Sequence, residues 1–128
     1  MIWVDASVWL EIALDQENAD RCQNFLELST EESLFTADFD VYSIILTMLK
    51  YKGKPQDIQK FLGALHVSNN LRIFRPSPGI MLEALEHMKP LSLSFDDSLS
   101  YSCMQSLGIN RIATLDRDYK KLGVEFVL

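Results

Sequence analysis

Short apolar runs alternate along this chain with longer segments in which apolar residues recur every three or four positions. The short runs predict β-strands over residues 1–5, 33–36, 71–74, 111–115 and 125–127. The longer segments predict helices over residues 7–14, 17–29, 38–51, 55–68 and 78–90, another between Ser94 and Gly108, and a short one around Tyr119. Because strands alternate with helices, the pattern indicates βαβ units. It therefore predicts an α/β fold with a central, mostly parallel sheet flanked by helices.

Residues that cap or break helices support these boundaries. Ser77 and Pro78 have the pattern of an N-cap followed by the first helical residue. Ser94 and Asp97 have the spacing of a capping box with aspartate in its final position. No linker, internal repeat or low-complexity segment divides the chain, so residues 1–128 are expected to form one domain.

The composition indicates a protein that folds without disulfide bonds or a structural metal. It has 128 residues, of which 48% are hydrophobic, enough to enclose a core. Cys22 and Cys103 have no metal-ligand spacing and are interpreted as reduced, buried residues. The start of the chain lacks the pattern of a signal peptide, and no apolar run approaches the roughly 20 residues that span a bilayer. A soluble cytoplasmic protein, not bound to a membrane, is expected.

The net charge of −6 argues against a surface that coats nucleic acid, because such surfaces are usually basic. It does not exclude a nuclease, since bound cations offset negative charge and local basic patches can follow a phosphate backbone. Two clusters are candidates for such patches: Lys50, Lys52 and Lys54, and Arg111, Arg117, Lys120 and Lys121. For most of these residues, a solvated position near a helix end is the simpler interpretation. A negative surface also suits a basic protein partner.

Three aspartates stand where strand-ending signals meet helix-starting ones. Asp5 and Asp116 follow predicted strands, and Asp97 opens a helical pattern. In open parallel sheets, ligands bind outside the carboxyl ends of the strands. Acids gathered there would form a negative pocket for a hard divalent cation, which prefers oxygen ligands. Asp96 and Asp118, in contrast, are interpreted as acids that favour the start of a helix.

Three segments carry a resemblance to a known family: residues 4–9 (VDASVW), 95–99 (FDDSL) and 114–119 (TLDRDY). Together they make the whole chain resemble the PIN-domain ribonucleases, and among these the small VapC-type toxins of prokaryotic toxin–antitoxin systems. The resemblance implies a single PIN-like domain that hydrolyses RNA phosphodiester bonds. It also implies a cognate antitoxin protein as a partner.

The resemblance assigns roles to five residues of this chain. Asp5, Asp97 and Asp116 would hold Mg²⁺ or Mn²⁺, and the hydroxyls of Ser7 and Thr114 would orient those carboxylates. A bound cation would lower the pKa of a water molecule and stabilise charge on the phosphoryl oxygens, so no side-chain nucleophile is required.

The second acidic motif departs from the family pattern. The family usually carries a glutamate in the helix after the second strand, five residues after a position that Asp38 occupies here. Ser43 stands in place of that glutamate. Asp40 lies three residues earlier, on nearly the same helix face, and is a further candidate catalytic acid. First-turn capping is the simpler interpretation of Asp38 and Asp40, so the sequence favours a site with three carboxylates and Ser43 at the usual position.

Two other classes of protein compete with an active nuclease. Ser43 supports a degenerate PIN domain that binds RNA or protein and cuts poorly or not at all. A phosphoacceptor receiver domain would need an aspartate after the third strand, where this chain has Arg75 and Pro76. That class is therefore excluded, and the binding module stays as the alternative.

The segments 40–51 and 55–65 carry apolar residues on more than one helical face. A small domain does not bury so wide a surface against one sheet, and such surfaces usually mark interfaces. By resemblance, toxins of this type dimerise or receive an antitoxin helix here. The sequence therefore predicts a homodimer through this region.

Overall fold

The computed structural model describes residues 1–51 and 53–128, so Lys52 of the first basic cluster lies outside the described residues. The strands are β1 (Ile2–Val4), β2 (Leu34–Ala37), β3 (Leu71–Phe74), β4 (Arg111–Ala113) and β5 (Glu125–Phe126). The helices are α1 (Ala6–Ala13), α2 (Ala19–Leu28), α3 (Asp38–Tyr51), α4 (Pro55–Val67), α5 (Pro78–Leu91), α6 (Phe95–Leu107) and the 3₁₀ helix η1 (Arg117–Leu122). The strands form one parallel sheet in the order β3-β2-β1-β4-β5. The predicted α/β fold is confirmed.

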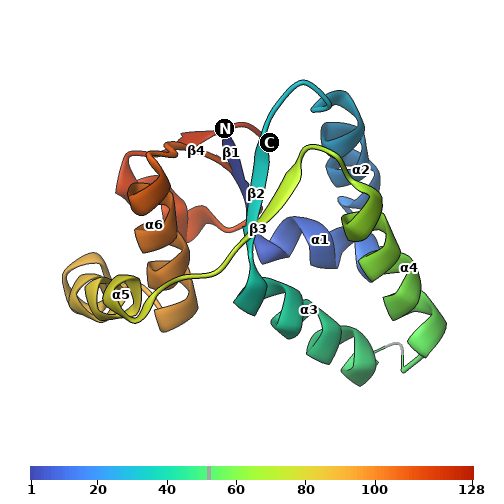
Figure 1. Cartoon of the computed structure of the whole chain (residues 1–128), viewed down its shortest axis with the longest axis horizontal. Coiled ribbons are helices and arrows are strands. Elements are labelled where there is room, and N and C mark those ends of the chain that lie inside the picture. Colours follow the sequence, from blue (N-terminus) through green and yellow to red (C-terminus); the bar gives the residue numbers. More distant parts are fainter. Residues whose placement is uncertain (52) are drawn as a thin grey trace.

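Helices cover both faces of the sheet (Figure 1): α5 and α6 lie on one side, and α1 to α4 on the other. The alternation of side chains along β1 supplies both layers, because successive residues of a strand point to opposite faces. Trp3 packs with Met104 of α6, whereas Ile2 and Val4 pack with Cys22 of α2. Among the described residues, no helix is long and apolar enough to cross a membrane.

The sheet order brings the acidic segments to one edge. β1 lies between β2 and β4, and all three strands run in the same direction. Asp5 directly follows β1, Asp116 comes shortly after β4, and α3 begins with Asp38 immediately after β2. The carboxyl ends of three neighbouring strands therefore meet where these aspartates begin the next elements, as expected for the ligand edge of a parallel sheet.

Three boundaries differ from the predictions for identifiable reasons. β4 ends at Ala113 and not at residue 115, because the backbone N–H of Leu115 donates to the Ser7 hydroxyl instead of continuing the ladder. The predicted helix 17–29 begins at Ala19, because residues 16–19 form a turn in which the N–H of Ala19 donates to the Gln16 carbonyl oxygen at 3.0 Å. α5 continues one residue beyond the predicted end, from Pro90 to Leu91. A proline in the last turn of a helix still prevents the helix from continuing much further.

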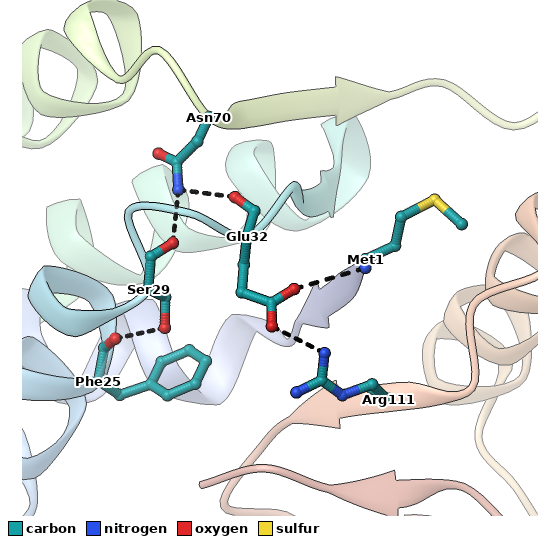
Figure 2. A network of polar contacts seen from close by, with 6 residues as sticks. All are labelled: Met1, Phe25, Ser29, Glu32, Asn70 and Arg111. Carbon is teal, nitrogen blue, oxygen red and sulfur yellow. Dashed lines mark hydrogen bonds and ion pairs between the residues drawn. The ribbon is translucent and has the colours of Figure 1, made fainter.

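A polar network lies at the amino ends of the strands, opposite the aspartates (Figure 2). Glu32 pairs with the Arg111 guanidinium at 2.9 Å and with the N-terminal amine at 3.6 Å. The Asn70 amide donates to the backbone oxygens of Ser29 and Glu32 at 2.9 and 3.0 Å. The network joins the starts of β1, β3 and β4 to the loop before β2. Arg111 therefore lies at the amino ends of the strands, away from the aspartates. The prediction that it belongs to one basic cluster with Arg117, Lys120 and Lys121 is corrected in this respect.

Candidate functional site

Asp5 is the central carboxylate of the edge where the aspartates meet. It follows the buried strand β1, caps α1, and is only 7% exposed. Its Oδ2 accepts hydrogen bonds from the Ser7 hydroxyl at 2.6 Å, the Thr114 hydroxyl at 2.9 Å and the Ser7 N–H at 3.3 Å. These donors offset the cost of burying one oxygen of the carboxylate. Its other oxygen, Oδ1, faces the Tyr119 hydroxyl at 3.5 Å.

The hydroxyls of Ser7 and Thr114 also link Asp5 to the segment that follows β4. The Ser7 Oγ accepts a hydrogen bond from the N–H of Leu115 at 3.1 Å. The Thr114 Oγ1 accepts one from the N–H of Asp116 at 3.0 Å. Each hydroxyl thus contacts the Asp5 carboxylate and a backbone group of the 114–116 turn. Through these contacts, the position of Asp116 depends directly on the residues that hold Asp5.

The carboxylates of Asp97, Asp116 and Asp118 form a cluster in which one oxygen of each lies within 4.8 Å of the others. Asp97 is in the first turn of α6, and Asp116 caps η1 by accepting from the N–H of Asp118 at 2.9 Å. Two of the three metal ligands implied by the resemblance are therefore together, while Asp5 is outside this close group. Asp118, expected only to favour the start of a helix, is within it. In the sequence, the one sign that Asp118 could join the cluster is its position two residues after Asp116.

Tyr119 connects Asp5 to this cluster, a role that the sequence reasoning missed. The side chain is fully buried, and its hydroxyl donates to Asp97 Oδ1 at 3.2 Å while lying 3.5 Å from Asp5 Oδ1. Burial raises the pKa of Tyr119, and the negative charges of Asp5 and Asp97 raise it further. The phenol therefore keeps its proton and remains a donor between the two carboxylates.

Asp40 is buried beside these acids from a third direction. It is in the first turn of α3 and is 6% exposed, and its Oδ2 has no hydrogen-bond partner among the described residues. Burial, followed by the charges of Asp5 and then Asp96, raises the pKa of Asp40 to about 8. Asp40 lies in the first helical turn, as the capping interpretation expects, but its Oδ2 accepts no hydrogen bond from a backbone N–H of the described residues.

Ser43 is placed differently from Asp40, although both are on α3. Its side chain is exposed, and its backbone oxygen accepts from the Thr47 hydroxyl at 2.8 Å. The buried residues of α3 are Asp40, Val41, Ile44 and Met48. Asp38, at the first position of the helix, accepts from the N–H of Phe39 at 2.7 Å, as a helix-start acid is expected to do.

The cluster carries unneutralised negative charge. Burial is the largest cause that raises the pKa of Asp97 to about 6, and the charge of Asp116 is the next. A hydrogen bond involving Ser94 opposes this shift. Among the described residues, the ion pairs involve Glu32 at the other edge of the sheet, so no lysine or arginine pairs with these aspartates. Such a group of oxygen ligands is chemically suited to a hard cation.

Comparisons with known proteins identify the family. The PIN domain model matches residues 2–125, so this chain belongs to the PIN domain family. A comparison with curated protein sequences gives no significant match.

Solved structures share the fold across nearly their whole length. VapC20 from Mycobacterium tuberculosis, a toxin that cleaves the sarcin–ricin loop, is 19% identical, with a TM-score of 0.83 over 97% of this chain and 96% of its own. VapBC2 from Rickettsia felis, solved with a promoter DNA fragment, is 17% identical, with a TM-score of 0.75 over 98% and 97%. FitAcB from Neisseria gonorrhoeae is 15% identical, with a TM-score of 0.66 over 98% and 96%. At these identities the likeness establishes the fold.

Proposed function

We propose that this PIN-domain protein is a divalent-cation-dependent endoribonuclease and the toxin of a toxin–antitoxin pair. The observation that carries the proposal is the convergence of Asp5, Asp97 and Asp116 at the carboxyl edge of the sheet, with Tyr119 between the first two. Acids brought together without a counter-charge destabilise the fold, and function is the usual reason for such an arrangement. Family membership supports the same conclusion.

The donor set fits Mg²⁺ or Mn²⁺. The facing groups are carboxylates, which such cations prefer, and the buried Oδ2 of Asp40, which has no partner among the residues that the structure describes, is an oxygen that a cation could satisfy. Asp5, Asp97 and Asp116 are the residues that would hold the ion. When bound, it would supply the charge that lowers the pKa of a water molecule and stabilises the phosphoryl oxygens.

The chain's own residues keep these carboxylates ready to bind. Ser7 and Thr114 fix one oxygen of Asp5 and leave the other facing the Tyr119 hydroxyl. Tyr119 donates to Asp97, which favours the ionised form of that acid and opposes the effect of burial. Preorganised side chains of this kind avoid a rearrangement during the reaction. The attacking group is water, so none of the serines or cysteines is needed as a nucleophile.

The toxin assignment is supported by the solved relatives, two of which are named as VapC20 and VapBC2. A groove of about 750 Å³ lies between α1, α2 and α4, away from the acids, with Trp9, Leu26 and Phe61 in its lining. An apolar helix of the antitoxin would fit such a groove. The net charge of −6 suits a basic partner. RNA as substrate and an antitoxin as partner imply action in the cytoplasm.

A homodimer remains part of the proposal. Tyr42, Leu46 and Leu49 of α3 are 62%, 67% and 47% exposed, and their spacing places them on one side of the helix. Exposed apolar residues grouped in this way favour an interface. In the second predicted segment, Leu62 of α4 is also an exposed apolar residue, with 40% of its surface accessible.

The proposal is tested by incubating the protein with a mixed RNA pool in Mg²⁺ or Mn²⁺, with EDTA and Asp5→Asn as controls. Cleavage should need the cation and should be lost in Asp5→Asn. Because water attacks the phosphorus in place of the RNA 2′-hydroxyl, the new ends should carry no 2′,3′-cyclic phosphate. Cleavage that persists in EDTA, or that equals wild type in Asp5→Asn, would refute the assignment. Cation-dependent RNA binding without cleavage would support the binding module instead.

A further inference from the structure

We propose that Asp40 is the fourth carboxylate of the cation site, supplied one turn earlier on α3 than the acid usually found at the position of Ser43. The inference deepens the proposed nuclease function and rests on it. Its basis is the combination of an acidic cluster with a separate buried carboxylate, one oxygen of which has no hydrogen-bond partner in the part of the chain that the structure describes.

The rotation of α3 explains why the side chain of Asp40 is buried, where the charges of Asp5 and Asp97 act on it, while that of Ser43 is exposed. The buried face of this helix consists of Asp40, Val41, Ile44 and Met48. With 3.6 residues per turn, Ser43 is roughly a third of a turn from the centre of that face. Accordingly, Ser43 is exposed, whereas Asp40 is 6% exposed. The helix follows β2 without an intervening loop, so its first turn lies directly at the carboxyl edge of the sheet.

The surroundings of Asp40 favour a role towards a cation over a structural one. A structural buried carboxylate is normally hydrogen-bonded or paired with a basic group, because desolvation of a charge is costly. Within residues 1–51 and 53–128 the Oδ2 of Asp40 has no hydrogen-bond partner, and the charges that raise its pKa come from Asp5, Asp96, Asp97 and Asp38. An oxygen with these neighbours gains most from a cation that it shares with Asp5 and Asp97.

A structural alternative exists, in which Asp40 is a protonated acid that only fills space. The two roles predict different results when the carboxylate is replaced by an amide of the same shape. If Asp40 only fills space, Asp40→Asn should bind Mn²⁺ like wild type. If Asp40 is a ligand, the variant should fold equally well without metal and bind Mn²⁺ more weakly.

The experiment is a titration of the metal-free full chain with Mn²⁺, followed by calorimetry and by the electron paramagnetic resonance of free Mn²⁺. Asp40→Asn, and Asp40→Ala as a second uncharged variant, should weaken the affinity at least about tenfold, as loss of an oxygen ligand predicts. Asp38→Asn removes a charge from the same helical turn and is the matched control, with a change below about threefold. Ser43→Glu should tighten binding by less than about threefold, since the fourth carboxylate is already present.

Each outcome of this titration has a separate meaning. Binding by Asp40→Asn equal to that of wild type, while Asp97→Asn loses binding, would overturn the role of Asp40 and leave the proposed function intact. A large gain in Ser43→Glu with no loss in Asp40→Asn would return the role to position 43. Absence of Mn²⁺ binding by wild type would overturn both the inference and the proposed function. The melting temperature of each variant without metal shows whether it is folded.

Discussion

Replacing Asp40 with asparagine should change how the stability of the metal-free protein depends on pH. The pKa of Asp40 is raised from an ordinary value of 3.8 to about 8, with burial as the main cause. A group whose pKa is higher in the folded state binds its proton more tightly there than in the unfolded chain. The contribution to stability is therefore fully present below the unfolded pKa and is lost progressively as the pH rises through the folded pKa.

The size of the effect follows from the two pKa values. At pH 7 the unfolded carboxyl group is about three units above its ordinary pKa, whereas the folded group is still mostly protonated. Each unit corresponds to about 1.4 kcal/mol, so wild type should lose about 4 kcal/mol of unfolding free energy from this group between pH 4 and pH 7. Asparagine does not titrate, and Asp40→Asn should lack this loss.

Urea denaturation in EDTA, followed by circular dichroism at several pH values from 4 to 8, measures the difference directly. The unfolding free energy of Asp40→Asn minus that of wild type should increase steadily with pH over this range. Other acids titrate in both proteins and largely cancel in the difference. A difference that is constant from pH 4 to pH 8 would refute the argument, because it would mean that Asp40 has the same pKa in the folded and unfolded states.

Three further predictions concern other parts of the molecule. Tyr119→Phe removes the hydroxyl that donates to Asp97, so the pKa of Asp97 should rise further. The acidic limb of the cleavage pH profile should then move up by about one pH unit. An unchanged limb would contradict the role of Tyr119 as a donor to Asp97. Leu46→Asp places a charge in the exposed apolar stripe of α3 and should convert the proposed dimer to a monomer in light scattering. A wild type that is already monomeric would defeat the dimer proposal. Arg111→Met removes a solvent-screened ion pair with Glu32 and should lower the unfolding free energy only slightly, without changing cleavage. A loss of cleavage at unchanged stability would show that the two ends of the strands are coupled.

Much of the fold could be predicted from the sequence, because the relevant signals are local. The apolar run before Asp5 indicates a buried strand, and an acid at its end can lie only at the carboxyl edge. The α/β alternation and the positions of Asp97 and Asp116 follow from patterns of the same kind. The shortened end of β4 could not be foreseen, since the Leu115 N–H is bound by Ser7, a residue more than 100 positions away in the chain.

The choice between Asp40 and Ser43 also lay beyond sequence reasoning. Residues three apart share much of a helix face, so periodicity alone does not separate them. The rotation of α3 determines which of the two side chains is buried, and it is set by the packing of Val41, Ile44 and Met48 in the core. Asp118 was assigned to helix capping for a similar reason. Which way its carboxylate turns depends on the 3₁₀ geometry of η1, which composition does not reveal.

The proposed cation site combines carboxylates from four elements. Diffraction from Mn²⁺-soaked crystals, recorded where the anomalous signal of manganese is strong, locates the bound ion. We expect an anomalous peak with carboxylate oxygens of Asp5, Asp40, Asp97 and Asp116 around it, at the roughly 2.0–2.6 Å expected for hard cations. No peak at this edge of the sheet under saturating Mn²⁺, or a peak only elsewhere on the protein, would contradict it.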